Sequence, residues 1–362
     1  MIVIFIIVFF ASYLICLFLI KYQWRNKYHL LDTMMDGVQK FHSKPVPRVG
    51  GLSIFCGLCL TVVLTAHKWD AFFLFYLLIA SLPAFLAGFL EDITKKVSPL
   101  IRLLATFGAA MLGFWLLRAG LNRIGLYSLD IFLEYYWIFS LILTIFAVGG
   151  ISHAVNIIDG YNGLASMVSI MILLALAYIS SRVGNFILCT IALGVAASVL
   201  GFFVWNYPRG LIFLGDGGAY LLGFLVAELS VLLITFHREV SPFFPLLLLI
   251  YPVIETLFSI YRRKIVRKTP ASMPDALHLH TLIHRRIVKW TIGDHPHLLD
   301  SNSLTSPYLW VLSSLSVIPA CLFWNDTYAL IYFIIVFIAF YISLYTWVVK
   351  FKTPKWMKLS KR

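Results

Sequence analysis

Asp216 is the acidic residue whose surroundings best suit chemistry. It stands between Gly215 and Gly217, where a long apolar stretch begins. A carboxylate with such open backbone on both sides can bind a divalent cation that bridges phosphate oxygens. The alternative is an ordinary N-cap, because aspartate often opens a helix. The pattern favours a metal site.

Glu91 and Asp92 are adjacent acids at the end of another apolar stretch. Two carboxylates there repel each other and are unfavourable beside the negative end of a helix dipole, unless a cation or a basic partner offsets them. This predicts a role in Mg²⁺ binding or proton transfer. The alternative is a solvated pair that Lys95 and Lys96 balance.

Asn156 and Asp159 lie three residues apart and are followed by Gly160. This spacing puts an amide and a carboxylate on one turn beside flexible backbone, which suits a nucleotide or a metal ion. A capped helical turn is the alternative, because both residues are good N-caps.

Two basic segments could bind phosphate. In the first, prolines fix the backbone around His42, Lys44 and Arg48, whose side chains are hydrogen-bond donors. In the second, His278 and His280 precede further arginines. No cysteine or acidic cluster completes a zinc site there, so these histidines fit an anionic substrate better. A merely basic loop is the alternative for each segment.

The elements that must position these residues are membrane helices. Of the 362 residues, 61% are hydrophobic and 12% are charged, whereas soluble domains have about 45–50% apolar and about 25% charged residues. A soluble globular protein is therefore excluded. Eleven apolar runs are long enough to cross a hydrocarbon core of about 30 Å. They span residues 2–20, 49–66, 72–90, 100–118, 135–152, 163–181, 184–204, 213–235, 242–260, 307–324 and 327–349. We expect an all-α polytopic membrane protein, with residues 1–362 forming one domain.

Basic residues predict the orientation of these spans. With the N-terminus outside and the C-terminus in the cytosol, 24 of the 29 Lys and Arg residues fall on the inside, as the positive-inside rule requires. The net charge of +13 is then mainly an orientation signal, and nucleic acid is not an expected partner because there is no room for a folded basic module. The inside loops expected to carry the chemistry are 21–48, 91–99, 153–162, 205–218 and 261–306.

The order and spacing of the motifs between His42 and His280 resemble those of the polyprenyl-phosphate N-acetylhexosamine-1-phosphate transferases, a family that includes the phospho-N-acetylmuramoyl-pentapeptide translocase. The resemblance implies transfer of a sugar 1-phosphate from a UDP-N-acetylhexosamine to a polyprenyl phosphate such as undecaprenyl phosphate, with release of UMP. It also implies Mg²⁺, with Mn²⁺ as the alternative ion. The expected setting is the bacterial inner membrane, with the active site on its cytosolic face. There the reaction would begin assembly of an envelope glycan, such as cell wall or lipopolysaccharide O-antigen. A homodimer is an arrangement left open.

By the same resemblance, Asp216 is the principal metal ligand, and Asp92 and Asp159 also lie at the metal. Asp92 matches a residue that deprotonates or positions the lipid phosphate. Asn156 and Asp159 match a motif close to the nucleotide sugar. Direct attack by the lipid phosphate, with Asp92 as base, is the favoured route, and a covalent aspartyl-phosphate is the alternative.

Further resemblances concern the rest of the substrate. Asn206 and Phe213 correspond to the amide and the aromatic ring that hold uracil. His278 and His280 match a histidine-rich loop expected near the diphosphate.

The sequence departs from the family pattern at two positions. Glu91 replaces an aspartate, and its longer arm keeps the charge, so a metal or base role can survive with altered geometry. Asn162 also replaces an aspartate, so we expect hydrogen bonding to substrate there. Two other classes stay open: a transporter or flippase of an anionic lipid or solute, and an inactive relative that serves as a scaffold.

Overall fold

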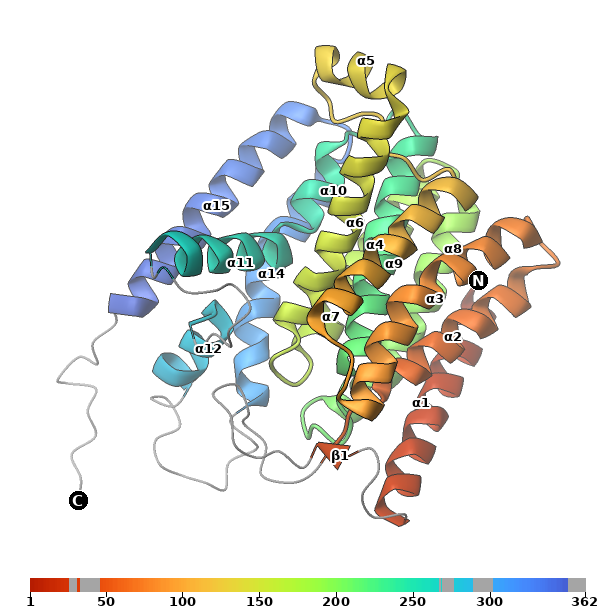
Figure 1. Cartoon of the computed structure of the whole chain (residues 1–362), viewed down its shortest axis with the longest axis vertical. Coiled ribbons are helices and arrows are strands. Elements are labelled where there is room, and N and C mark those ends of the chain that lie inside the picture. Colours follow the sequence, from red (N-terminus) through yellow and green to blue (C-terminus); the bar gives the residue numbers. More distant parts are fainter. Residues whose placement is uncertain (26–30, 33–45, 267, 269–276, 289–301, 351–362) are drawn as a thin grey trace.

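The computed structural model describes residues 1–25, 31–32, 46–266, 268, 277–288 and 302–350. Over these residues the chain is a bundle of membrane helices (Figure 1), as the apolar runs predict. Two short strands, β1 (Leu31–Asp32) and β2 (Val46–Pro47), pair in antiparallel fashion near one end of the bundle. The long helices are α1 (Ile2–Arg25), α2 (Gly50–Thr65), α3 (Ala71–Thr94), α4 (Pro99–Leu116), α6 (Trp137–Ile158), α7 (Leu164–Arg182), α8 (Phe186–Asn206), α9 (Gly215–Phe236), α14 (Ser306–Leu322) and α15 (Thr327–Lys350).

Nine helices among the described residues are long and apolar enough to cross a membrane. The helix α2 occupies another expected run but has only 16 residues. The single helix expected over 242–260 is wrong: this run forms α10 (Phe243–Leu248) and α11 (Ile250–Tyr261). In Figure 1, α11 lies across the direction of the bundle.

Pro252 explains this break. A proline has no N–H to donate, and its ring collides with the carbonyl four residues earlier. That carbonyl belongs to Leu248, the last residue of α10. Pro252 itself is the third residue of α11, where its missing N–H costs nothing because first-turn amides have no partner within the helix. The chain therefore turns between the two helices.

The helix α9 forms the centre of the bundle. Its residues from Gly215 to Ile234 are buried, and it packs against α2, α3, α4, α6 and α7. A helix that is apolar on all sides is expected to be surrounded by protein or lipid. Because Asp216 lies in the first turn of α9, this carboxylate is fixed by the most enclosed element of the fold.

Glycines allow α9 to lie very close to its neighbours. A Cβ atom on Gly88 of α3 would come within 2.5 Å of the Asp216 carbonyl carbon, and one on Gly51 of α2 would come within 2.3 Å of the Gly218 nitrogen. Helices approach this closely only where both present backbone rather than side chains. These contacts bring the end of α3 and the start of α2 against the first turn of α9.

Candidate active site

Asp216 is the centre of a polar cluster at one end of the bundle. Its Oδ1 accepts hydrogen bonds from Arg48 Nη2 and Asn156 Nδ2, both at 3.2 Å. Its Oδ2 accepts one from Arg102 Nη1. The Asp216 side chain is 11% exposed. Two guanidinium groups and an amide therefore surround a nearly buried carboxylate, which makes these hydrogen bonds charge-assisted.

Asp92 holds the first turn of α9 from the side. Its two oxygens accept hydrogen bonds from the backbone N–H groups of Asp216 and Gly217, each at 2.9 Å. The first amides of a helix have no partner within it, so Asp92 satisfies two of them from α3. Arg48 Nε lies 3.8 Å from Asp92 Oδ1, and the Asp92 side chain is 1% exposed.

Gly215 makes this contact sterically feasible. It has a φ of +77°, a left-handed conformation that glycine adopts without strain. A Cβ at this position would lie 2.4 Å from the Arg48 carbonyl oxygen and 2.5 Å from Asp92 Oδ2. A side chain here would push both groups away from Asp216.

Backbone pairing brings Arg48 to the site. The Phe213 N–H donates to the Pro47 carbonyl at 2.8 Å, and the Gly50 N–H donates to the Phe213 carbonyl at 2.9 Å. Gly51 continues the pairing with the Leu214 carbonyl at 2.9 Å. The segment after β2 is thereby fixed along the entry to α9, so residues far apart in the sequence meet at Asp216.

Asp159 lies at the end of α6, one turn after Asn156. The residue is half-buried. Removal from water raises the pKa of its carboxyl to about 7; Arg48 lowers the pKa, while Asp216 and Asp92 raise it further. This carboxyl therefore changes its charge near neutral pH, and its electrostatic partners are the residues of the cluster.

His278 and His280 lie beside this turn. The two rings stack with centroids 5.1 Å apart and an interplanar angle of 6°. His280 packs against Tyr161, with ring centroids 5.4 Å apart, and its Nε2 lies 3.1 Å from where a Gly160 Cβ would be. The histidine segment thus covers the residues that follow Asp159.

The other predicted residues lie in different environments. Asn206 is buried, and its amide bridges the Gly163 N–H at 2.6 Å and the Ile212 carbonyl at 2.8 Å. Asn162 is also buried, and its amide donates to the Pro208 carbonyl at 3.2 Å. Both side chains tie the turn after α6 to the segment between α8 and α9. Their contacts with substrate stay predictions.

Phe213 and Glu91 lie at the edge of the cluster. Phe213 is half-buried in the segment that precedes α9. Glu91 turns away from its neighbour in sequence, because its Oε2 accepts a hydrogen bond from the Val97 N–H at 2.8 Å. The predicted acid pair is therefore divided: one acid holds α9, and the other holds the turn after α3. His42 and Lys44 lie outside the described residues.

Arg102, Tyr220 and His153 were missed by the sequence reasoning. Arg102 was counted only as an inside charge, although a lone guanidinium in the first turn of an apolar run signals a buried acidic partner. Tyr220 lies one turn after Asp216 on α9, and its electrostatic neighbours include Asp216 and Arg102. The His153 ring lies 4.8 Å from the Tyr220 ring. These residues form the wall of the cluster between α4, α6 and α9.

The side chains around Asp216 offer oxygen donors to a metal ion. Among the described residues, no three His, Cys, Asp or Glu side chains converge into a metal cage. Mg²⁺ does not require one, because it usually binds through one or two carboxylates and completes its shell with water and substrate phosphate oxygens. Asp216, Asn156 and Asp159 supply oxygen donors of that kind, and so the cluster fits a hard divalent ion.

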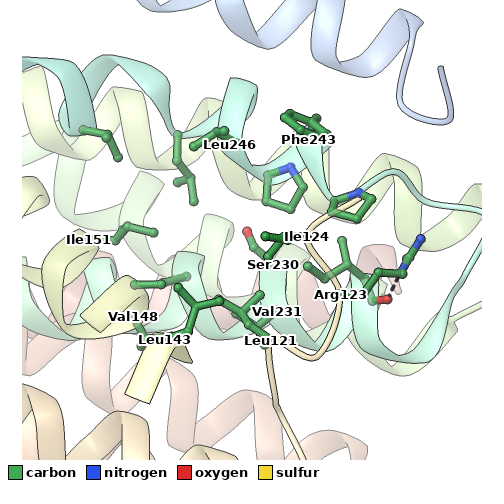
Figure 2. A pocket seen from close by; sticks show the side chains of 17 residues that line it. Leu121, Arg123, Ile124, Leu143, Val148, Ile151, Ser230, Val231, Phe243 and Leu246 are labelled. Atoms are coloured by element: carbon green, nitrogen blue, oxygen red, sulfur yellow. Dashed lines mark hydrogen bonds between the residues drawn. The ribbon is translucent and has the colours of Figure 1, made fainter. Parts of the chain in front are cut away.

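A separate cavity of about 200 Å³ opens between α6, α9 and α10. Figure 2 shows Leu143, Val148 and Ile151 of α6 facing Leu246 and Phe243 of α10 across it. Its lining is almost entirely apolar, and it shares no residue with the Asp216 cluster.

This chain is similar in sequence to known proteins. The model of glycosyl transferase family 4 matches residues 74–234. A probable undecaprenyl-phosphate N-acetylglucosaminyl 1-phosphate transferase of Bacillus subtilis is 31% identical over 67% of this chain and 66% of its own length, slightly less than two thirds. The undecaprenyl-phosphate alpha-N-acetylglucosaminyl 1-phosphate transferase of Thermotoga maritima is 32% identical over 70% of this chain and 72% of its own. A phospho-N-acetylmuramoyl-pentapeptide-transferase of Streptococcus thermophilus is 32% identical over 46% of this chain and 50% of its own.

Proposed function

Because this chain belongs to glycosyl transferase family 4, we propose that it transfers a sugar 1-phosphate from a UDP-N-acetylhexosamine to a polyprenyl phosphate, with release of UMP. The relatives from Bacillus subtilis and Thermotoga maritima are named as transferases that act on undecaprenyl phosphate and an N-acetylglucosaminyl group, the first as a probable one. The observation that carries the proposal is the convergence of Arg48, Arg102 and Asn156 on Asp216. Such a cluster at the end of a membrane bundle suits a reaction between a soluble nucleotide sugar and a lipid phosphate.

The reaction joins two anions. An oxygen of the acceptor phosphate attacks the phosphorus that carries the sugar, and the bond from this phosphorus to the bridging oxygen of UMP breaks. Phosphoryl transfer depends mainly on positioning and on electrostatic stabilisation of the transferred group. Arg48 and Arg102 have the planar, multiply donating groups that bind phosphate oxygens best.

Mg²⁺ is part of this proposal. Asp216, Asn156 and Asp159 would hold the ion, which supplies positive charge to the phosphate oxygens of the donor. Among the described residues of the cluster, three carboxylates, those of Asp92, Asp159 and Asp216, face two arginines, Arg48 and Arg102. The negative excess supports the need for an added cation when an anionic substrate arrives.

The two remaining acids take different tasks. Asp92 is nearly inaccessible and accepts two backbone hydrogen bonds, which supports a role in positioning Asp216. Asp159 is partly exposed, and burial raises its pKa to about 7. A proton and the ion compete for this carboxylate, so we assign to Asp159 a metal-binding role that weakens as the pH falls through about 7.

The prenyl chain of the acceptor needs an apolar surface near the cluster. The cavity in Figure 2 is an apolar space between α6 and α10, and it extends along α9 from Ala227 to Ile234, away from the end that carries Asp216. Ile151, in its wall, precedes Asp159 by eight residues, or about 12 Å along the helix. We therefore place the prenyl chain along this cavity, with its phosphate at the Asp216 cluster.

The setting we propose is a bacterial cytoplasmic membrane with the cluster on the cytosolic face. The relatives named above are bacterial proteins. With α10 and α11 taken together as one crossing, 24 of the 29 Lys and Arg residues flank the spans on that side, which supports the same face. Soluble UDP-sugars would reach the site from the cytosol.

A direct assay tests this function. Purified protein is incubated with radiolabelled UDP-N-acetylglucosamine or a related donor, undecaprenyl phosphate and Mg²⁺. We expect a lipid-linked radioactive product and one UMP per product, and we expect Asp216→Asn to abolish both. Absence of product with every UDP-N-acetylhexosamine tested would overturn the proposal. Uptake of donor into proteoliposomes without UMP release would favour a transporter instead.

A further inference from the structure

Glu255 of α11 is a fully buried carboxylate that the function described above does not use. It is 1% exposed. Its Oε1 accepts hydrogen bonds from His278 Nδ1 at 3.1 Å and from the Leu279 N–H at 2.9 Å. Its Oε2 accepts one from the Tyr341 hydroxyl at 2.8 Å. One side chain thus joins α11, the histidine segment and α15.

Such a carboxylate is costly unless it is satisfied. Burial of an unpaired polar group or charge carries a large free-energy penalty. Glu255 avoids this penalty because three donors hydrogen-bond to its carboxylate. Glu228 of α9 shows the contrast, because it is also fully buried but neither of its oxygens has a hydrogen-bond partner among the described residues. The network around Glu255 is therefore specific to its position and not a general property of buried glutamates in this bundle.

The contacts of Glu255 fix the orientation of the His278 ring. With Nδ1 held by Glu255, the other ring nitrogen, Nε2, faces Arg263, whose Nη2 lies 3.5 Å away. The same ring stacks on His280, which packs against Gly160 in the turn after Asp159. The network therefore turns Nε2, not Nδ1, toward Arg263.

Tyrosines of α15 reinforce this arrangement. Tyr341 and Tyr345 are four residues apart and so lie on the same face of the helix. The Tyr345 hydroxyl donates to the Leu277 carbonyl at 3.2 Å and accepts from Arg262 Nη1 at 2.9 Å. The last long helix thus holds Leu277 directly and Glu255 through Tyr341, although α15 itself has no residue in the Asp216 cluster.

We propose that Glu255, held by Tyr341, is a positioning residue that fixes the ring of His278 so that Nε2 is the atom presented to the diphosphate of the substrate. This inference rests on the proposed function. Carboxylates that orient a functional histidine from behind typically change activity by about 10- to 100-fold when removed. We expect a loss of that size in kcat for Glu255→Ala.

Glu255→Gln separates positioning from charge. The glutamine oxygen can accept from both His278 and Leu279, while its amide donates to the Tyr341 hydroxyl. If position is what matters, Glu255→Gln recovers most of the turnover that Glu255→Ala loses. The matched control is Glu228→Gln, the same change at a buried glutamate outside the network, and we expect it to leave turnover near that of the wild type.

A double-mutant cycle tests whether Glu255 acts through His278. Glu255→Ala is expected to lower kcat in the wild type and to cause no further loss in a His278→Ala background. Equal losses in both backgrounds, or wild-type turnover in Glu255→Ala, would overturn the proposal. His278→Gln places an amide nitrogen near the position of Nε2 and His278→Asn near that of Nδ1, so higher activity in the asparagine variant would also overturn it.

Hydrogen exchange distinguishes this inference from the function on which it rests. The Leu279 amide donates to Glu255, so Glu255→Ala should speed exchange in the peptide 277–288 whether or not the protein is active. A wild-type chain that makes no product but shows this change would overturn the proposed function and leave the contact established. Unchanged exchange in Glu255→Ala together with full transferase activity would overturn the positioning role alone.

Discussion

Replacement of Asp92 by asparagine is expected to loosen the first turn of α9. In the wild type, the two carboxylate oxygens accept the backbone N–H groups of Asp216 and Gly217, each at 2.9 Å. Asparagine has one acceptor oxygen and one amide nitrogen that can only donate. One backbone N–H would then face another donor in a site from which water is nearly excluded.

The expected free-energy change follows from the lost hydrogen bond. A hydrogen bond to a charged group contributes about 1.5–3 kcal/mol, and a buried donor left without a partner costs about 1–3 kcal/mol. We take about 2 kcal/mol as the effect on local opening of the turn. With about 1.4 kcal/mol for each tenfold change, the open population rises about 30-fold.

Hydrogen exchange followed by mass spectrometry measures this opening directly. Exchange in a peptide that covers residues 213–220 should be about 30-fold faster in Asp92→Asn than in the wild type. Glu91→Gln is the matched control, because Glu91 contacts the Val97 N–H and not α9. Equal exchange in Asp92→Asn and the wild type would refute the positioning role of Asp92. A loss of transferase activity with unchanged exchange would point to direct proton transfer instead.

Three further results are expected. Arg102→Gln should lower kcat about 100-fold in the radiolabel assay, because removal of one donor that stabilises the charge of the transferred group typically costs about 100- to 1000-fold; activity near that of the wild type would show that Arg102 is dispensable. Gly88→Ala should lower the unfolding temperature in detergent, since its Cβ would lie 2.5 Å from the Asp216 backbone, whereas Gly108→Ala, with open space around it, should be neutral. Mg²⁺ affinity, measured by calorimetry, should fall from pH 8 to pH 6, because Asp159 gains a proton as the pH falls through about 7 and the ion must displace it; a pH-independent affinity would contradict its role as a ligand.

The sequence predicted the class of the fold and the grouping of the site residues. Apolar runs longer than the hydrocarbon core leave a chain little choice but membrane helices. Because successive spans alternate in direction, the ends of α3 and α6 and the start of α9 must lie on the same side. This alternation alone brought Asp92, Asn156, Asp159 and Asp216 to one end of the bundle.

The break between α10 and α11 is a feature that the hydropathy pattern did not predict. A hydropathy average does not detect a break within 242–260, because the Leu, Ile and Phe residues around the prolines keep the whole run apolar. The position of Pro252, four residues after Leu248, decides where the helix ends. Proline alone does not mark such a break in the sequence, because Pro83 lies within α3 and Pro319 within α14, and both helices continue through their proline.

Only the tertiary structure decided which side chains face one another. Arg102 pairs with Asp216, 114 residues away, and Glu255 pairs with Tyr341, 86 residues away. Such pairs depend on how each helix is rotated about its axis, and helices that are apolar on nearly every side carry little information about that rotation. The sequence by itself therefore determined the medium, the helices and the end of the bundle where the acids meet. Packing decided that Asp92 holds α9, that Glu91 turns away and that Asn206 bridges backbone groups, because backbone contacts at Gly51 and Gly88 set the register of the central helix.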